Sequence, residues 1–348
     1  MSDTRERVVR AGIVGANGYI GGELCRILLG HPHVELVAPV SRSLAGKRVD
    51  GVHPNLRGLT DLTFTAPDDA PDCDVLFLAT PHRETMAMVS RWAGRAGVLI
   101  DLSADFRLRD PAVYRRYYGA EHTAPELLAE FVTGLPERHR KELVGADRIS
   151  VPGCMATAAI LALYPLAAAG LIAGRVSVDG RIGSSGSGSG AGPMNLHAER
   201  SGAMRVFAPL GHRHEAEVAQ ATGLDVTMGA TGVEAVRGAQ VVCRAPLATE
   251  VREPELRRVY RECYGDEPFV RIVAQRRGLY RLPEPKILSG SNFCDVGFAL
   301  DAERGEVVAV GALDNLVKGA AGNAVQCLNI RQGWPERLGI EFPGLHPL

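Results

Sequence analysis

The chain has 348 residues, of which 46% are hydrophobic and 23% are charged. This length exceeds what one hydrophobic core usually organises, so two domains are expected. With 39 basic and 40 acidic residues the net charge is −1, and no overall field would attract nucleic acid or a membrane. The charged N-terminus lacks the apolar stretch of a signal peptide, and no run approaches roughly 18 apolar residues. We therefore expect a cytoplasmic protein.

The seven cysteines are odd in number and scattered, and none is spaced as a metal-binding knuckle or a Cys-x-x-Cys pair. Such a pattern favours reduced thiols over a disulfide framework. We also predict no metal site.

The first part of the chain alternates short apolar runs with helical segments. Continuous apolar runs are typical of strands buried on both faces, and this alternation predicts a parallel sheet with crossover helices. The expected strands are 7–14, 33–39, 74–79 and 97–101, and the expected helices are 23–29 and 84–94, with a glycine turn at 15–22.

The pattern changes after Cys154. A glycine- and serine-rich run at 183–192 precedes mixed short strands, which predicts an antiparallel or mixed sheet in a second domain. The run is short for a flexible linker and lies inside a domain-sized segment, so we favour a tight active-site loop. Strands are expected at 240–244, 295–300 and 307–312, and a helix at 315–331.

The glycine turn reads Gly-Ala-Asn-Gly-Tyr-Ile-Gly at 15–21 and joins the first strand to the first helix. Missing side chains at Gly15 and Gly18 would let the backbone approach a pyrophosphate at the helix N-terminus. The spacing is Gly-x-x-Gly-x-x-Gly rather than Gly-x-Gly-x-x-Gly, so a close-packed turn without a ligand is the alternative. We predict a dinucleotide site.

The second strand is followed by Ser41, Arg42 and Ser43, where an NAD enzyme would carry an acidic residue. A carboxylate there would repel a 2′-phosphate, whereas an arginine between two hydroxyls can bind it through charge-assisted hydrogen bonds. The sequence therefore predicts NADP(H), with a solvated surface arginine as the alternative.

Cys154 follows a Val-Pro-Gly turn and opens an apolar helical stretch. A helix start carries partial positive charge and N–H donors without intrahelical partners, which favour a thiolate over the thiol. The residue is a candidate nucleophile, although most cysteines outside disulfides are simply small buried hydrophobes.

A histidine cluster, Gly-His-Arg-His-Glu-Ala-Glu, lies at 211–217. His214 and Glu217 are three residues apart and share a face on a helical turn, so the carboxylate can orient an imidazole that assists a thiol. His212 would point elsewhere, and it is the candidate base if His214 is not. A solvated polar turn is the ordinary interpretation of such a cluster.

Together, a nicotinamide site, a helix-start thiol and a histidine indicate thiolate attack on an activated acyl group, a thioester, and hydride transfer to give an aldehyde. Motifs along nearly the whole chain then resemble the N-acetyl-γ-glutamyl-phosphate reductases. They are Gly-x-x-Gly-Tyr-x-Gly-Gly-Glu-Leu at 15–24, Asp-Leu-Ser-Ala-Asp-Phe-Arg at 101–107, Pro-Gly-Cys at 152–154, His-Arg-His at 212–214 and Asp-Asn-Leu-Val-Lys-Gly at 314–319.

The resemblance implies an α/β fold. A Rossmann NADP-binding domain would span 1–153, completed by a C-terminal helix within 315–348. An α+β catalytic and oligomerisation domain, like that of semialdehyde dehydrogenases, would span 154–314. The implied activity is reduction of an acyl phosphate to a semialdehyde by NADPH with release of phosphate, in a homodimer or homotetramer.

The resemblance also implies roles for individual residues. Cys154 corresponds to the nucleophile and His214 to the base. To these the three-residue spacing adds Glu217 as the third catalytic residue. The implied cofactor positions are Gly15, Asn17, Gly18, Tyr19, Ile20, Ser41, Arg42, Ser43 and Asn315, and the implied substrate positions are Ser103, Arg107 and His212. For Arg107, a structural salt bridge is the alternative to substrate contact.

Within the family, the chain resembles more closely the LysW-type reductases. Members of that branch act on α-aminoadipyl or glutamyl phosphates carried on a small acidic amino-group carrier protein. The resemblance lies in His-Pro-Asn-Leu-Arg-Gly at 53–58, Cys-x-Ala-Thr-Ala at 154–158 and the long ending at 329–347. Met155 and the stretch Leu-His-Ala-Glu-Arg at 196–200 depart from that branch.

In contrast, Ser-Gly-Ala-Gly at 189–192 resembles the acetylglutamyl type. We favour a carrier-linked substrate in lysine- or arginine-type biosynthesis, with N-acetyl-γ-glutamyl phosphate as the alternative. An acidic carrier would be attracted by basic residues near the pocket, which Lys47, Arg48, Arg57 and the stretch 275–281 can supply. Ordinary solvated surface is the other interpretation of these residues.

Two further functions compete with the reductase. A catalytically silent NADP-binding sensor would need neither a nucleophile nor a base, so Cys154, His214 and Glu217 argue against it. A phosphorylating dehydrogenase for another small acid, such as aspartate semialdehyde, would use the same chemistry with a different pocket.

Overall fold

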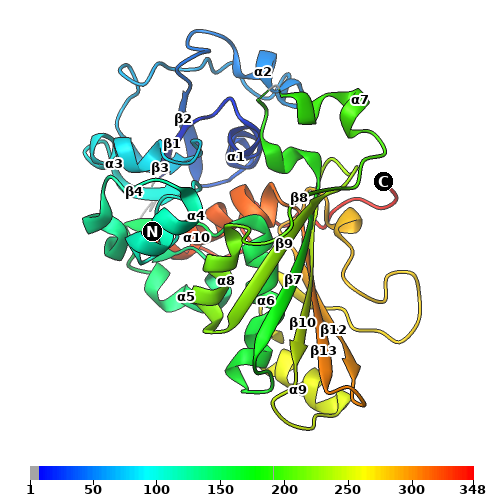
Figure 1. The fold of residues 1–348 in the computed structure, drawn as a ribbon. Coiled ribbons are helices and arrows are strands. Elements are labelled where there is room, and N and C mark those ends of the chain that lie inside the picture. The colour runs from blue at the N-terminus through cyan, green and yellow to red at the C-terminus, as the bar shows by residue number, and fades with distance from the viewer. Residues whose placement is uncertain (1–7, 191) are drawn as a thin grey trace, which may run out of the picture. The chain divides into compact units, whose positions relative to one another are not determined.

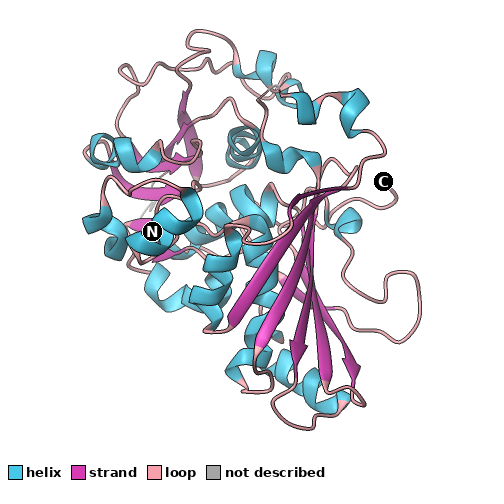
Figure 2. Cartoon of the chain, viewed as in Figure 1, coloured by secondary structure: helices cyan, strands magenta, loops and turns pink. Residues whose placement is uncertain are grey.

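The computed structural model describes residues 8–190 and 192–348, which form two compact units (Figures 1 and 2). Each unit contains one β-sheet with helices around it, and each is assembled from separate stretches of the chain. Unit 1 comprises the residues up to 109 together with 122–151 and 321–341, and unit 2 comprises 110–121, 152–320 and 342–348.

Four short segments lie in a different unit from the one that the sequence indicates. Residues 110–121, 152–153, 315–320 and 342–348 group with unit 2, whereas the sequence analysis assigned them to the first domain. Tyr117 in the first segment donates a hydrogen bond to Glu215 at 2.5 Å. Phe342 in the last segment lies against Gly290. These contacts join positions far apart in the chain, so hydrophobic periodicity carries no trace of them.

Unit 1 is built on a six-stranded parallel sheet with the order β2-β1-β3-β4-β6-β5. Its central strands are apolar and buried on both faces, as expected for a parallel sheet covered by helices. The four strands predicted in this region are confirmed. The strands are β1 (Val9–Val14), β2 (Val34–Val40), β3 (Cys73–Leu78), β4 (Ala96–Asp101), β5 (Val132–Thr133) and β6 (Arg148–Ser150).

The first helix begins earlier than predicted, at Tyr19 rather than at residue 23, because Gly18 already has the extended backbone of an N-cap. Tyr19 and Ile20 therefore belong to the helix and not to the turn. The helices of unit 1 are α1 (Tyr19–Leu29), α2 (Val49–Val52), η1 (Pro54–Leu56), α3 (Thr85–Ala93), η2 (Pro125–Glu130), α5 (Pro136–Leu143) and α10 (Gly322–Gln332).

Helix α10 returns to unit 1 and packs against α1 and α5. Buried amide side chains fix it: Asn323 donates to the carbonyl of Gly134 at 2.7 Å, and Asn329 lies 3.0 Å from His31 Nε2. The helix predicted at 315–331 is in fact a π-helical turn, η6 (Val317–Ala321), followed by α10. The C-terminal segment thus contributes buried polar contacts to the Rossmann core.

Unit 2 contains a seven-stranded mixed sheet with the order β11-β12-β13-β10-β7-β9-β8. The β7–β9 and β11–β12 pairs are parallel and the other pairs are antiparallel, which confirms the predicted mixed sheet. The strands are β7 (Arg175–Ile182), β8 (Arg205–Ala208), β9 (Asp225–Gly232), β10 (Ala239–Pro246), β11 (Val270–Ile272), β12 (Cys294–Asp301) and β13 (Glu306–Leu313).

The long helix α6 packs across this sheet against β10 and β13 and is buried along most of its length (Figure 1). Two tyrosines of α9 donate to its carbonyls, Tyr260 to Ala162 and Tyr264 to Leu161. The helices of unit 2 are α4 (Pro111–Tyr118), α6 (Cys154–Ala168), η3 (Ser184–Ser187), η4 (Pro193–Asn195), α7 (His197–Arg200), α8 (His214–Thr222), α9 (Glu253–Tyr264) and η5 (Pro285–Leu288).

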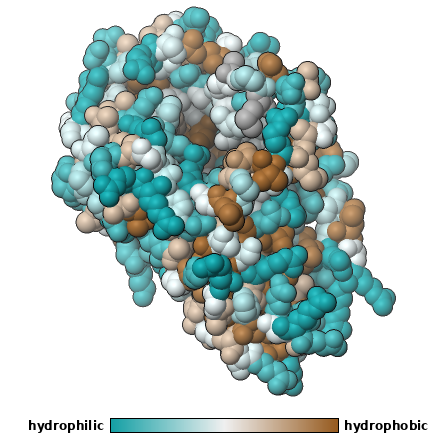
Figure 3. All heavy atoms as spheres, in the orientation of Figure 1, coloured by the Kyte–Doolittle hydropathy of each residue, from teal (hydrophilic) through white to brown (hydrophobic). Residues whose placement is uncertain are grey.

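The surface drawn in Figure 3 carries separate hydrophobic groups among polar residues. Large exposed apolar side chains lie in and beside the edge strand β8: Met204, Val206, Phe207 and Leu210 are between 45% and 81% exposed. Among the described residues, no helix combines the length and apolar character needed to cross a membrane.

Candidate active site

Cys154 is the first residue of α6, as predicted. Gly153 precedes it in an extended conformation, and no side chain caps the helix. The thiol is partly exposed and lies where the helix concentrates partial positive charge. Because most of α6 is buried, the thiol is carried by a rigid element of the core.

The other six cysteines have different surroundings, and none of the seven is in a disulfide. Burial raises the pKa of the Cys25 thiol to about 12 and also raises the pKa of Cys73 and Cys243. A thiol with a raised pKa is a poor nucleophile at neutral pH. Cys154 is therefore distinguished from the buried cysteines by its exposure, and from Cys263, which is also partly exposed, by its position at a helix start.

The π-helical turn η6 lies against the Cα and Cβ of Cys154. A Cβ atom placed on Gly319 would be 2.5 Å from Cys154 Cβ and 3.0 Å from its Cα. Only glycine permits this approach, which explains the glycine at the end of the 314–319 motif. Lys318, in the same turn, is fully buried, and π-helical turns occur frequently at functional sites.

His214 lies against the turn that carries Cys154. It is the first residue of α8 and is 5% exposed. A Cβ atom on Gly153 would lie 2.2 Å from His214 Nε2, so the imidazole fits there only because residue 153 is glycine. The structure thus brings together two residues that the sequence identified separately.

Glu217 joins the same group. Its Oε1 is 3.9 Å from His214 Nε2, the arrangement expected for residues three apart on a helix. Its Oε2 accepts the backbone N–H of Gly153 at 2.8 Å. The carboxylate therefore faces the imidazole and also connects α8 to the start of α6, a second contact that the sequence did not predict.

His212 lies just before α8, and its ring meets the His214 ring edge-on at 4.6 Å and 82° rather than pointing away from it. Its Nδ1 accepts the backbone N–H of His214 at 3.2 Å. Burial, with a smaller contribution from the Arg213 charge, lowers the pKa of His212 to about 4. An imidazole of such low basicity is a poor acid–base candidate near neutral pH.

Glu215 and Tyr117 are two residues near this group that the sequence analysis did not single out. Glu215 accepts the Tyr117 hydroxyl at 2.5 Å and the Met228 N–H at 2.8 Å. Tyr117 comes from α4, a distant segment of the chain. The only sequence signal for this pair is the acidic residue Glu215 inside the histidine cluster.

In unit 1 the glycine turn has the geometry of a dinucleotide cradle. Gly15 has φ +83°, and a Cβ there would lie 2.4 Å from the Ala79 carbonyl oxygen. Gly21 packs as closely against Gly15. In contrast, a Cβ on Gly18 would meet only one atom, at 3.6 Å, and no side chain caps α1. The turn is tight on its inner side and open at the helix start, which fits a pyrophosphate.

His53 supports this turn. Its Nε2 donates to the Ala16 carbonyl at 2.8 Å. A Cβ on Gly22 would lie 2.7 Å from the His53 ring. The motif at 53–58 therefore contributes to the shape of the glycine turn, a role that the sequence analysis missed.

The residues after β2 differ in exposure. The Arg42 side chain is 82% exposed and has Glu84 as a carboxylate neighbour at 3.9 Å. Ser43 is exposed, whereas Ser41 is 2% exposed and accepts the Leu44 N–H. Arg42 and Ser43 therefore remain the accessible members of this predicted 2′-phosphate site, and Ser41 shapes the turn.

Asn315, a predicted cofactor contact, lies in unit 2 and is 4% exposed. Its Nδ2 donates to Ser185 Oγ at 3.0 Å, and its Oδ1 accepts the Gly238 N–H at 2.8 Å. These bonds attach the glycine- and serine-rich run to the residue that precedes β10. The run itself contains one 3₁₀ turn, η3, and a second, η4, follows it.

Ser103 and Arg107 follow β4 in unit 1, and both make local hydrogen bonds. Ser103 is 1% exposed, donates to Asp101 and accepts the Asp105 N–H. Arg107 donates to the carbonyls of Val151 and Leu102 at 2.8 and 3.0 Å. The geometry gives both residues a role in holding this loop, and substrate contact stays a prediction for them.

The same loop is tied to the loop after β3. Asp105 is fully buried and accepts the N–H groups of Arg83 and Met86 at 2.8 and 3.0 Å. Arg83 has φ +73°, a positive value that no other non-glycine residue of the described chain shows. A positive φ held by a buried carboxylate at the carboxyl edge of the sheet is a feature that often accompanies function, so ligand contact by this loop stays a prediction.

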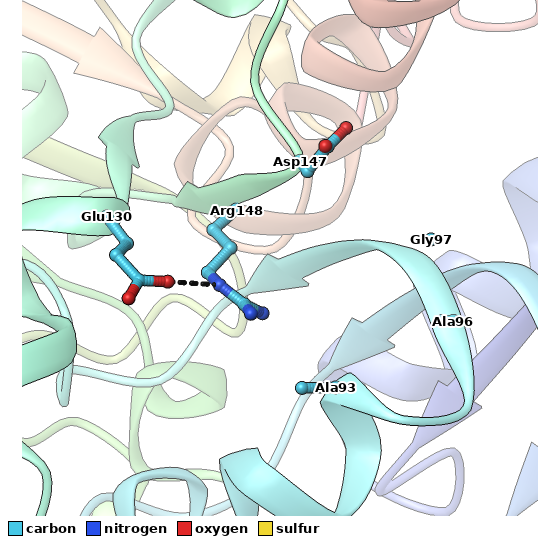
Figure 4. A pocket seen from close by; sticks show the side chains of 6 residues that line it. All are labelled: Ala93, Ala96, Gly97, Glu130, Asp147 and Arg148. Atoms are coloured by element: carbon cyan, nitrogen blue, oxygen red, sulfur yellow. Dashed lines mark hydrogen bonds and ion pairs between the residues drawn. The ribbon is translucent and has the colours of Figure 1, made fainter.

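The cavity shown in Figure 4 lies in unit 1, at the opposite edge of the sheet from the glycine turn. It measures about 360 Å³ and lies where β4 and β6 begin. Ligands of open α/β sheets bind at the carboxyl ends of the strands, so this cavity is not the expected cofactor site. It is lined by Ala93, Ala96, Gly97, Glu130, Asp147 and Arg148, with Glu130 and Arg148 in an ion pair.

The basic residues that the sequence predicts near the pocket have different surroundings. Arg48 pairs with Asp50 and Asp61 at 2.7 and 2.9 Å, whereas the Arg276 side chain in unit 2 is 83% exposed.

Within 8–190 and 192–348, no three His, Cys, Asp or Glu residues are grouped so that they could hold a metal ion.

Comparison with known families matches both halves of the chain. Residues 10–146 match the semialdehyde dehydrogenase NAD-binding domain. Residues 154–315 match the semialdehyde dehydrogenase dimerisation domain.

Similar proteins are related over nearly their full length. A putative [LysW]-L-2-aminoadipate 6-phosphate reductase of Thermomicrobium roseum is 51% identical over 98% of this chain and 100% of its own. The [LysW]-L-2-aminoadipate 6-phosphate reductase of Deinococcus radiodurans is 46% identical over 96% and 97%. A putative [LysW]-L-2-aminoadipate/[LysW]-L-glutamate phosphate reductase of Cenarchaeum symbiosum is 44% identical over 98% and 100%.

Solved structures share the fold at low sequence identity. Aspartate semialdehyde dehydrogenase II of Vibrio cholerae has a TM-score of 0.67 at 15% identity, covering 93% of this chain and 98% of its own. A probable aspartate-semialdehyde dehydrogenase of Pseudomonas aeruginosa has a TM-score of 0.67 at 20% identity, covering 94% and 100%.

Proposed function

The chain belongs to the family of [LysW]-L-2-aminoadipate and [LysW]-L-glutamate phosphate reductases, oxidoreductases built from semialdehyde dehydrogenase domains, and from this we propose its substrate, its catalytic residues and its mechanism. The proposed reaction converts a carrier-linked acyl phosphate and NADPH to the semialdehyde, NADP and phosphate. The observation that carries the proposal is the close approach of His214 Nε2 to Gly153, which puts an imidazole beside the turn that presents Cys154.

In the first step, the Cys154 thiolate attacks the acyl carbon and the C–O bond to phosphate breaks, which leaves a thioester and free phosphate. The uncapped start of α6 provides N–H donors that can stabilise the oxyanion. Because α6 is buried against the sheet, the thiol and these donors are held rigidly relative to each other.

In the second step the thioester carbon is reduced. Bound NADPH supplies the hydride. His214 then donates a proton to the thiohemiacetal oxygen and takes it back as the C–S bond breaks to release the aldehyde and the Cys154 thiolate. Glu217 keeps the imidazole oriented, since its carboxylate is 3.9 Å from Nε2 and is itself held by Gly153.

The family is NAD(P)-binding, and the residues of unit 1 fit such a cofactor. The open, uncapped start of α1 at Gly18 would hold the pyrophosphate. The exposed Arg42 and Ser43 would bind a 2′-phosphate, and this supports NADP(H) over NAD.

The substrate is proposed from the relatives, whose names specify an aminoadipyl or glutamyl group carried on LysW. N-acetyl-γ-glutamyl phosphate is the alternative. The test is the reverse reaction, followed as NADPH formation with phosphate and, in parallel, carrier-bound semialdehydes of aminoadipate and glutamate or free N-acetylglutamate semialdehyde. Activity with the carrier-bound forms alone supports the proposal, and activity with the free acetylated aldehyde alone overturns it.

A Cys154→Ser variant separates an enzyme from a cofactor-binding sensor. We expect turnover to fall by about a thousandfold or more because the serine hydroxyl is a far weaker nucleophile without a strong base, while NADPH binding is retained. Unchanged turnover would remove the thioester from the mechanism.

For the assembly and its location we propose a homodimer or homotetramer in the cytoplasm, with a carrier protein as the partner. The match to a dimerisation domain supports the oligomer. The exposed arginines of the stretch 275–281 support contact with an acidic carrier.

A further inference from the structure

We propose that Tyr117 and Glu215 are a positioning pair for His214, and that this pair is the reason why α4 groups with unit 2. The inference rests on the proposed function, because it takes His214 as the acid–base residue. Neither Tyr117 nor Glu215 contacts the thiol in this account. They act through the turn from which His214 projects.

Both oxygens of the Glu215 carboxylate are engaged. Oε1 accepts the Tyr117 hydroxyl at 2.5 Å, and Oε2 accepts the Met228 N–H at 2.8 Å. The residue is 9% exposed. Rotating this side chain would leave buried hydrogen-bonding groups without their partners, which costs more than the bonds themselves contribute. Glu215 is therefore a fixed point immediately after His214.

The turn around His214 is hydrogen-bonded to β9 through both backbone groups of Met228. The N–H of His212 donates to the Met228 carbonyl at 3.0 Å, and the Met228 N–H donates to Glu215. The N–H of Glu215 also donates to the His212 carbonyl at 2.8 Å. His214 lies between these attachment points, so its backbone has little freedom to rotate.

Tyr117 brings a third element to this turn. Helix α4 is short but well terminated: Asp110 accepts the Ala112 N–H at its start, Pro111 occupies the first turn, and Gly119 ends it in the left-handed conformation at φ +64°. The segment 110–121 is inserted between stretches of unit 1 and yet groups with unit 2. The hydrogen bond from Tyr117 to Glu215 accounts for this arrangement.

The hydroxyl of Tyr117 stays protonated at neutral pH and donates its hydrogen bond. Burial, followed by its bond to the Glu215 carboxylate, raises the pKa of Tyr117 to about 12. Tyr117 and Met228 together satisfy the Glu215 carboxylate. Glu217 is then the carboxylate that faces His214, at 3.9 Å from Nε2. Loss of the Tyr117 hydroxyl would release one side of Glu215 and loosen this arrangement.

The test is Tyr117→Phe, which removes the hydroxyl and keeps the ring. The matched control is Tyr260→Phe, which removes a buried hydroxyl that donates to the Ala162 carbonyl at 2.5 Å elsewhere in unit 2. We expect kcat to fall about tenfold in Tyr117→Phe, with KM for both substrates within about twofold, as for loss of an orienting contact. Tyr260→Phe should lower the unfolding midpoint and leave kcat unchanged.

Glu215→Gln provides a second, conservative variant. Its amide oxygen can still accept the Met228 N–H, so we expect a smaller loss of kcat than in Glu215→Ala. The positioning role is overturned if Tyr117→Phe retains full kcat, or if Tyr260→Phe lowers kcat as much as Tyr117→Phe does. Neither outcome affects the proposed function, which the Cys154→Ser variant tests separately.

A measurement without substrate keeps the two hypotheses separate. The rate at which iodoacetamide alkylates Cys154, resolved by peptide mass spectrometry, depends on the imidazole beside the thiol. We expect Tyr117→Phe to slow this alkylation several-fold and Tyr260→Phe to leave it unchanged. Equal rates in the wild type and Tyr117→Phe would overturn the positioning pair even if the acyl phosphate substrate proves to be a different one.

Discussion

The Glu217 carboxylate accepts the backbone N–H of Gly153 at 2.8 Å, so the helix that carries His214 is bonded directly to the turn that carries Cys154. Glu217 is 3% exposed, and the bond lies inside unit 2. A change at either end of this bond should therefore affect both stability and catalysis.

Glu217→Ala removes the acceptor and leaves the Gly153 N–H buried. We expect the free energy of unfolding to fall by about 1–3 kcal/mol and kcat to fall by about 10- to 100-fold, as for other residues that orient a catalytic histidine. Urea unfolding and steady-state kinetics measure the two effects. As a control, Glu253→Ala breaks a more exposed ion pair with Arg257 and should preserve kcat. Full activity of Glu217→Ala would argue against its orienting role.

Gly153→Ala places a methyl group where His214 Nε2 now lies, 2.2 Å from the new carbon. The backbone at Gly153 has φ −65°, which alanine adopts without strain, so any loss comes from the displaced imidazole. We expect kcat to fall by about 100-fold with NADPH affinity retained. Gly145→Ala, which meets no atom within 4 Å, is the control. A fully active Gly153→Ala would show that the imidazole position does not matter.

Arg42→Ala tests the cofactor preference. Removing a charge-assisted hydrogen bond costs about 1.5–3 kcal/mol, so the Kd of NADPH should rise by about 10- to 100-fold. The Kd of NADH should change by less than about twofold, since it has no 2′-phosphate. Fluorescence titration measures both constants. Glu84→Gln removes the carboxylate 3.9 Å from Arg42 and should tighten NADPH binding slightly. Equal weakening of both cofactors by Arg42→Ala would contradict the assignment.

His212→Gln should change how stability depends on pH. Burial lowers the pKa of His212 to about 4 from an ordinary value of 6.5. Between these values the unfolded chain binds more protons than the folded one, so stability is lost as pH falls from 6.5 to 4. The contribution of this residue is about 3 kcal/mol over that window. The variant should therefore lose less stability than the wild type on acidification.

Urea unfolding at a series of pH values between 4 and 7 measures this difference. Asp101 acts in the opposite direction, because burial and the nearby Asp105 charge raise its pKa to about 7. The comparison of variant with wild type cancels that background. His346→Gln, near the exposed end of the chain, is the control, and parallel curves for wild type and His212→Gln would contradict the prediction.

The sequence by itself determined the elements of the fold and the chemistry of the candidate site. Apolar runs predicted the buried strands of unit 1, and the Val-Pro-Gly turn predicted that Cys154 begins a helix. The three-residue spacing placed His214 and Glu217 on one helical face, and the structure has them so. These features are local, because helix and strand periodicity and turn residues leave a signal within a few positions of the chain.

Only the tertiary structure decided which distant residues meet. It placed Gly319 against Cys154, joined Glu217 to Gly153, and brought Tyr117 to Glu215 across a long stretch of chain. It also assigned Asn315 to a buried network with Ser185. Such contacts depend on how whole elements pack, so no local period or motif in the chain encodes them in a form that can be read from one sequence.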